Sequence, residues 1–130
     1  MGDFLKETLD KCGVSTEGLI SDADYFTTLA FVKLADNGER NFAFARKPGA
    51  DMLLTKDDID ENEIRQAKMV HAGSVNMTKE PARGANLYAM KLAHDNGKLV
   101  SFDVNYRDTL WENEAACKEV ADQVYDYVDF

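Results

Sequence analysis

The sequence has few cysteines and no long apolar run. Its two cysteines, Cys12 and Cys117, are too far apart for a metal-ligand pair, and both fall on apolar stripes of expected helices. No apolar segment approaches the roughly 20 residues that a membrane-spanning helix needs. Charged side chains occupy the segment 1–12, where a secretory signal would be apolar. We therefore expect a cytoplasmic protein whose two thiols are reduced and lie in the core.

Positive charge is also scarce. Lys and Arg number 15 against 24 Asp and Glu, which gives a net charge of −9. Such a surface repels phosphate backbones and anionic bilayers, so we expect neither nucleic acid nor membrane as a partner. The 130 residues are 45% hydrophobic, which is enough to bury the core of one domain and argues against a disordered chain.

The first part of the chain predicts a helix followed by a hairpin. Apolar residues at helical spacing predict a helix over 3–12, which ends at Gly13. Residues 26–34 and 41–46 are rich in aromatic and β-branched residues and are separated by a polar turn. Because that turn contains Asn37-Gly38, we expect a type I′ turn and antiparallel pairing of the two strands.

The second hairpin strand carries the first candidate binding residues. Phe42, Phe44 and Arg46 share a face because side chains alternate along a strand. The two aromatic rings could pack against a sugar or a planar group, while the guanidinium of Arg46 binds a hydroxyl or an anion. The alternative is that the two Phe side chains pack on the sheet and that Arg46 is solvated.

The second part of the chain predicts a βαβ unit. An apolar strand over 69–75, a helix over 80–95 and an apolar strand over 99–104 follow one another, and a last helix starts at Asn113. This order predicts a parallel sheet with a right-handed crossover and helices on both faces. Two such strands leave both sheet edges unpaired. We therefore expect the chain to be a piece of something longer.

Polar side chains follow the second of these strands. Asp103, Asn105 and Arg107 lie at or beyond its carboxyl end, and Gly73 and Ser74 lie at the equivalent end of the preceding strand. Ligands of open α/β sheets bind outside the carboxyl ends of the strands. The alternative is structural: Asp103 and Arg107 pair across the turn while Asn105 satisfies the loop backbone.

Four stretches together resemble the PfkB or ribokinase-like carbohydrate kinases, most closely bacterial fructokinases. They are TTLAFVKL with the GERNFAFAR hairpin, PGADMLL, HAGSVNMTKEPAR and SFDVNYRDTLW, in the family's order and spacing. The resemblance implies a partial Rossmann-like ribokinase fold with an antiparallel lid. One partial domain then covers 1–130, with a lid over about 18–46 and core segments 1–17 and 55–130.

The resemblance also implies an activity, namely phosphoryl transfer from ATP, with Mg²⁺, to a hydroxyl of a ketohexose such as fructose. It makes Phe44, Arg46, Asp103, Asn105 and Arg107 substrate-binding residues, with Arg107 also a possible stabiliser of charge on the moving group. It further implies a homodimer formed through the lid hairpin. No metal ligands are assigned within the chain.

The chain departs from the family pattern in two respects. Ala45 stands where the family usually has tyrosine before the lid arginine. The glycine-rich anion hole, the catalytic aspartate and the adenine pocket have no counterpart, so the isolated chain is expected to be inactive. A kinase for 2-keto-3-deoxygluconate or another sugar acid, and a non-catalytic assembly module, remain as alternatives.

Overall fold

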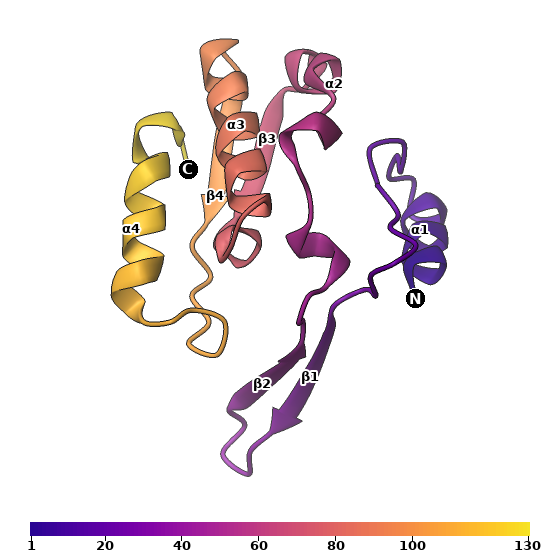
Figure 1. Ribbon diagram of the computed structural model, residues 1–130, viewed down its shortest axis with the longest axis vertical. Helices are drawn as coiled ribbons and strands as arrows, with labels where there is room; N and C mark the ends of the chain where they lie inside the picture. The colour runs from indigo at the N-terminus through magenta and orange to yellow at the C-terminus, as the bar shows by residue number, and fades with distance from the viewer. The chain divides into compact units, whose positions relative to one another are not determined.

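The computed structural model describes all 130 residues. The chain forms two compact units, Met1–Asp51 and Met52–Phe130. Figure 1 labels their helices and strands along the chain. None of the helices combines the length and the apolar character that crossing a bilayer would take.

The first unit begins with helix α1, Gly2–Lys11, which ends where Gly13 adopts a φ of +76°. This boundary agrees with the predicted helix to within one residue. The helix buries none of its side chains, and Phe4 on its apolar stripe is 63% exposed. Cys12 is likewise exposed and free, so the expectation that both thiols lie in the core is wrong for Cys12. Helical periodicity in the sequence identifies the apolar side of a helix, but it does not show whether another element packs against that side.

A hairpin completes most of the first unit. Strands β1, Leu29–Leu34, and β2, Arg40–Ala45, pair antiparallel, as the sequence predicted. The turn between them is not type I′, because Gly38 has a φ of +84° while Asn37 lies outside the left-handed region. Gly38 N–H instead donates to the Ala35 carbonyl at 2.9 Å, and Ala35 N–H donates to Glu39 at 2.8 Å. Such a three-residue loop places a single glycine in the left-handed conformation.

The second unit is the predicted βαβ unit, flanked by helices. It contains α2 (Glu61–Gln66), β3 (Met69–Gly73), α3 (Ala82–Asp95), β4 (Leu99–Asp103) and α4 (Glu114–Val124). Strands β3 and β4 pair in parallel, with Val70 opposite Val100 and Gly73 opposite Asp103. Helix α4 starts as predicted, because the Asn113 side chain accepts from Ala116 N–H at 2.9 Å.

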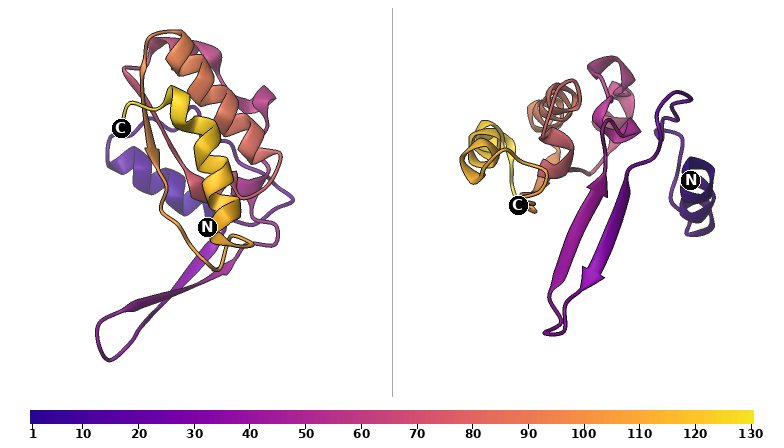
Figure 2. Two further views of the ribbon diagram at one scale, coloured as in Figure 1. Left: turned by 90° about the vertical axis from the view of Figure 1, so that its left-hand side faces the viewer. Right: turned by 60° about the horizontal axis from the view of Figure 1, so that its bottom comes forward.

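The core of this unit lies between the sheet and the helices α3 and α4, and the left view of Figure 2 shows β4 next to these two helices. Met90 of α3 and Val120 and Val124 of α4 pack with the sheet residues Ala72 and Val100 in one buried cluster. Its other buried members are Ile64, Met77, Ala93, Trp111 and Cys117, so the second thiol lies in the core as expected.

The opposite face of this sheet has little cover. Met69 and Leu99 are each 44% exposed, and His71 is exposed with its ring nitrogen 3.1 Å from Ser101 Oγ. Within this unit, helices therefore cover one face of the sheet and not both. The sequence predicted two covered faces because both strands are apolar at successive positions, which is the pattern of a doubly covered strand.

The end of the chain lies along β4. Phe130 N–H approaches the Val100 carbonyl at 3.3 Å, and Phe102 N–H donates to the Phe130 carbonyl at 3.0 Å. The Asp129 carboxylate also accepts from Val100 N–H at 2.8 Å. These bonds lie on the edge of β4 that faces away from β3 and have the pattern of a parallel pairing.

Candidate functional site

The carboxyl ends of β3 and β4 lie side by side, as expected, since Gly73 is paired with Asp103. Ser74 follows β3 directly and is only 1% exposed. Its hydroxyl donates to the Val104 carbonyl, which ties the start of the loop after β4 to the end of β3. A buried hydroxyl with a backbone acceptor fixes the position of the segment that follows. This role of Ser74 was not predicted from the sequence.

The loop after β4 carries three of the predicted site residues. Asp103 and Asn105 are exposed, and Arg107 is half-buried. Asn105 has a φ of +31°, the only positive value outside the glycines. Arg107 Nη1 donates to the Tyr106 carbonyl at 3.0 Å. A left-handed residue in the middle of a short loop reverses the chain locally, and asparagine tolerates it better than most residues.

Arg46 follows β2 and lies in a different environment. Its side chain is 4% exposed, and its Nε and Nη2 atoms lie 2.8 Å and 2.6 Å from Asp51 Oδ2. The alternative in which Arg46 is solvated is therefore wrong. Because two of its nitrogens contact the same carboxylate, the guanidinium has a fixed orientation, and its positive charge is compensated.

Thr28 and Gly49 complete this arrangement. The Thr28 hydroxyl donates to Asp51 Oδ1, so both carboxylate oxygens of Asp51 have donors. A Cβ atom on Gly49 would lie 2.0 Å from Thr28 Oγ1 and 2.7 Å from Asp51 Oδ1, so no larger residue fits without displacement. We call Thr28, Arg46, Gly49 and Asp51 the Arg46 cluster.

The sequence contained a signal for the Arg46 cluster. Asp51 is the first acidic residue after Arg46, and the β1–β2 register, extended by one position, places Thr28 opposite Arg46. The PGAD segment counts among the stretches that resemble the kinase family, but that resemblance does not match its acidic residue to the nearby arginine. The short sequence separation of Arg46 and Asp51, just past the end of a predicted strand, is the signal that predicts their ion pair.

Phe44 lies next to Phe42 on one face of the hairpin, as predicted. The two rings stack with centroids 6.2 Å apart and an interplanar angle of 11°. Ala30 and Val32 lie opposite them on β1. Val32 and Leu34 on the same face are 53% and 68% exposed, so the face is apolar and accessible at its tip.

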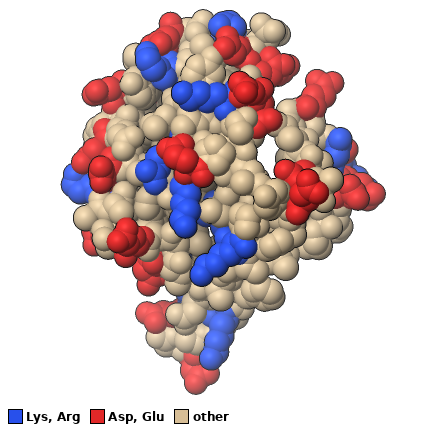
Figure 3. Space-filling view, viewed as in Figure 1, with Lys and Arg blue, Asp and Glu red and all other residues tan.

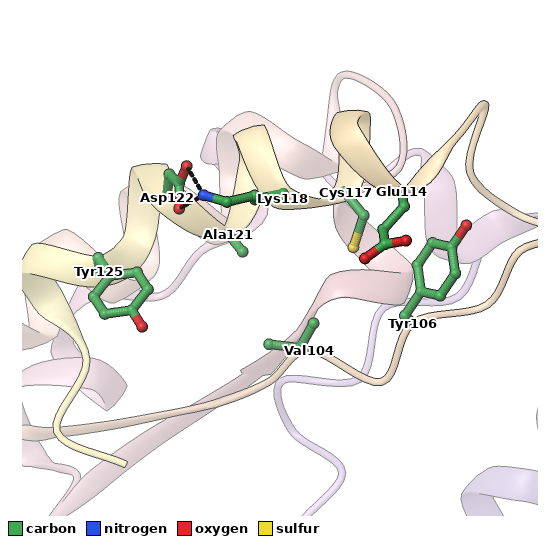
Figure 4. A pocket seen from close by; sticks show the side chains of 8 residues that line it. All are labelled: Val104, Tyr106, Glu114, Cys117, Lys118, Ala121, Asp122 and Tyr125. Atoms are coloured by element: carbon green, nitrogen blue, oxygen red, sulfur yellow. Dashed lines mark hydrogen bonds and ion pairs between the residues drawn. The ribbon is translucent and has the colours of Figure 1, made fainter.

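Two cavities flank the outer edge of β4 and the helix α4, and Figure 4 shows one of them. Its volume is about 350 Å³, and its lining includes Val104, Tyr106 and Cys117; the second cavity, of about 280 Å³, includes Phe102 and Phe130. Burial raises the pKa of the Cys117 thiol, while a hydrogen bond with Ser74 acts in the opposite direction. Neither cavity is lined by Asp103, Asn105 or Arg107.

Charged side chains are intermixed over the face of the molecule in Figure 3, without a single extended basic region. No group of three or more His, Cys, Asp or Glu side chains comes together in the manner of metal ligands. The two cavities are mainly apolar and offer no cluster of cations for a triphosphate. The residues present therefore do not fit a complete site for ATP or Mg²⁺.

The predicted site residues fall into two groups, one in each unit. Phe44 and Arg46 belong to Met1–Asp51, whereas Asp103, Asn105 and Arg107 belong to Met52–Phe130. Within the first group, the structure adds Thr28, Gly49 and Asp51 as neighbours of Arg46. Within the second, it adds Ser74 as the residue that holds the loop.

Comparison with known proteins gives consistent matches. The profile of the pfkB family carbohydrate kinases matches residues 1–130. Fructokinase-2 of Oryza sativa is 43% identical over 129 residues, which are 99% of this chain and 38% of that protein. The chain thus spans about two fifths of the length of the curated relatives that it matches.

Solved structures agree with this result. The crystal structure of fructokinase from Xylella fastidiosa with bound ATP has a TM-score of 0.82 at 33% identity and covers 95% of this chain and 39% of that one. A fructokinase double mutant from Vibrio cholerae, solved with fructose, ADP and potassium, has a TM-score of 0.87 at 28% identity. It covers 99% of this chain and 41% of that one.

Proposed function

Because this chain belongs to the pfkB family of carbohydrate kinases, we propose that it is the sugar-facing part of an ATP-dependent kinase that phosphorylates a hydroxyl of a ketohexose such as fructose. The relatives that match nearly the whole chain are fructokinases. The observation that carries the proposal is the position of Asp103 at the carboxyl end of β4 and of Asn105 and Arg107 in the loop that follows. In α/β sheets, this is where polar ligands are held.

In this proposal the loop after β4 binds the sugar end of the reaction. Asp103 and Asn105 are exposed and offer oxygen acceptors to sugar hydroxyls. Arg107 lies two residues beyond Asn105 and carries a delocalised charge that stabilises a phosphoryl group during transfer. Phosphoryl transfer depends on positioning and on neutralising charge, so one well-placed guanidinium contributes even in an acidic protein.

The hairpin unit carries its own candidate residues for sugar binding. Phe44 presents an aromatic ring, and rings of this kind pack against the apolar C–H face of sugars while hydroxyl groups bond elsewhere. Arg46 lies two positions beyond Phe44, directly after β2, and its carboxylate partner is Asp51. Bound ATP would supply the phosphoryl group, and both its site and the proton acceptor are assigned to sequence outside these 130 residues.

A chimeric enzyme tests the proposal directly. Residues 1–130 replace the matching segment of the Oryza sativa fructokinase, with which they share 43% identity. Release of ADP is then measured with fructose, ribose and 2-keto-3-deoxygluconate. We expect turnover of fructose by the chimera and none by the isolated chain. A chimera that unfolds cooperatively but phosphorylates no sugar contradicts the proposal.

A sugar-acid kinase is the second candidate, because the guanidinium of Arg107 is one that a carboxylate could meet, although Asp51 already compensates the charge of Arg46. Preferential turnover of 2-keto-3-deoxygluconate by the chimera would favour it. The same three-substrate assay therefore separates the two candidates.

The exposed face of the hairpin supports a further proposal, a homodimer formed through the lid. Val32, Leu34, Phe42 and Phe44 make one apolar face on a two-stranded ribbon, and such a ribbon is marginally stable alone. A second copy of the same face covers it symmetrically. Should the chimera lack kinase activity while the 130-residue chain forms a defined dimer, a non-catalytic assembly module becomes the better description.

A further inference from the structure

The buried guanidinium of Arg46 already has an anionic partner of its own. Both of its contacts with Asp51 are shorter than 3 Å, and its side chain is 4% exposed. A buried guanidinium without a counter-charge would be a strong binding site for a carboxylate. With Asp51 in place, an incoming anion meets a compensated pair.

We propose that Asp51 is a specificity-determining residue that makes the hairpin unit select neutral sugars over sugar acids. The inference rests on the proposed function, because it names the substrate class for which the hairpin residues are suited. Two physical effects act in the same direction. The carboxylate of Asp51 neutralises the charge that would attract a sugar acid, and it accepts hydrogen bonds from the hydroxyls of a neutral sugar.

The exposure of Asp51 supports the second effect. Its side chain is 29% exposed, whereas that of Arg46 is 4% exposed. The face that the pair presents to a ligand is therefore the carboxylate more than the guanidinium. A hydroxyl finds an acceptor there, while the carboxylate of a sugar acid finds a like charge at short range.

Asp51 is also held so that it cannot easily release Arg46. Thr28 donates to one carboxylate oxygen and Arg46 to the other. Gly49 lets the carboxylate lie close to the backbone, since a Cβ atom there would be 2.7 Å from Asp51 Oδ1. Swinging the carboxylate away breaks bonds at both oxygens, so the compensated state persists when a ligand arrives.

The first test uses the 130-residue chain and does not depend on kinase activity. The Nε–H signal of Arg46 is followed by NMR while gluconate, a sugar acid, or sorbitol, its neutral counterpart, is added. We expect the wild-type signal to be insensitive to gluconate and the Asp51→Asn signal to shift with it. Asp36→Asn is the matched control, because it removes the same charge from an exposed position in the hairpin loop of the same unit.

The second test measures specificity in the fructokinase chimera. Asp51→Asn is expected to lower the ratio of kcat/KM for fructose to kcat/KM for 2-keto-3-deoxygluconate by about tenfold or more, the effect of one charge-assisted hydrogen bond. Asp36→Asn should leave the ratio unchanged. If Asp51→Asn does not fold, Thr28→Val loosens the same carboxylate, and a smaller change in the same direction is expected.

The outcomes separate this inference from the proposed function. A chimera that turns over no sugar refutes the proposed function, while the NMR titration still decides whether Asp51 shields Arg46. A chimera that phosphorylates fructose with an unchanged substrate ratio after Asp51→Asn refutes the inference alone. A wild-type Arg46 signal that shifts with gluconate as strongly as the variant's also refutes it.

Discussion

Replacing Gly49 by alanine should destabilise the first unit through the Arg46 cluster. The added Cβ atom would lie 2.0 Å from Thr28 Oγ1, which is too short for a real contact, and 3.2 Å from Thr28 Cβ, which is tighter than most. Thr28 must therefore move away, and its hydrogen bond to Asp51 is lost. Overpacking costs about 1–3 kcal/mol, and a hydrogen bond to a charged group contributes about 1.5–3 kcal/mol.

The two costs are not additive, because the movement that relieves the clash is the one that breaks the hydrogen bond. We therefore expect the free energy of unfolding of the first unit to fall by about 3 kcal/mol. The Thr28→Ala change removes the atom that lies closest to the added methyl group. In the Gly49→Ala and Thr28→Ala double variant, the combined loss should be smaller than the sum of the single losses.

Amide hydrogen exchange of the β1 and β2 strands is the suitable measurement. The only tryptophan, Trp111, lies in the second unit, so its fluorescence reports on that unit instead. Gly18→Ala is the control, because nothing lies within 4 Å of the added Cβ atom and its φ is not positive. Equal protection of the hairpin amides in wild type and Gly49→Ala would refute the close packing on which the Arg46 cluster depends.

Three further predictions follow from the other features. In the fructokinase chimera, Arg107→Ala should lower kcat about 100-fold with little change in the urea midpoint. Arg107→Lys should restore only part of the loss, because an ammonium lacks the planar, two-pronged geometry of a guanidinium. Equal losses of activity and stability would support a structural ion pair. If the hairpin mediates a dimer, Val32→Lys should yield a monomer in light scattering, whereas Phe31→Lys on the opposite face should not. A monomeric wild-type chain would contradict the proposed dimer. The raised pKa of buried Cys117 contributes stability that is complete below the ordinary thiol pKa and is lost as pH rises through the pKa of the folded state. The free energy of unfolding in urea should therefore decline at alkaline pH, and Cys117→Ala should reduce that decline. An unchanged decline in the variant would exclude this thiol as its source.

The sequence predicted those elements for which local pattern and tertiary packing agree. The alternation in β2 and the apolar runs of β3 and β4 gave both pairings correctly. Asn113 identified the start of α4, because its side chain caps the helix from within the same segment. In each case the decisive interaction joins residues close in sequence, or follows from strand order alone.

The predictions were wrong or incomplete where the structure depends on a contact between distant residues or on the backbone conformation of a loop. Cys12 lies on an apolar stripe, but no other part of the first unit covers it. The Asn-Gly dipeptide favours type I′, yet the three-residue loop that formed needs a left-handed conformation only at Gly38. Ser74 was recognised as a strand-end residue, but its bond to Val104 spans 30 positions and depends on the parallel register.

The two arginines of the candidate site differ in a way that the sequence does not show. Arg46 directly follows β2, Arg107 lies in the loop after β4, and the sequence predicts a substrate contact for each. Arg46 is buried, and a carboxylate from its own unit compensates its charge. Arg107 is half-buried in a loop, where its Nη1 donates to the carbonyl of Tyr106. In the proposed function, a guanidinium beside the moving phosphoryl group stabilises its negative charge, and we assign that role to Arg107 and the binding of neutral hydroxyls to Arg46 with Asp51.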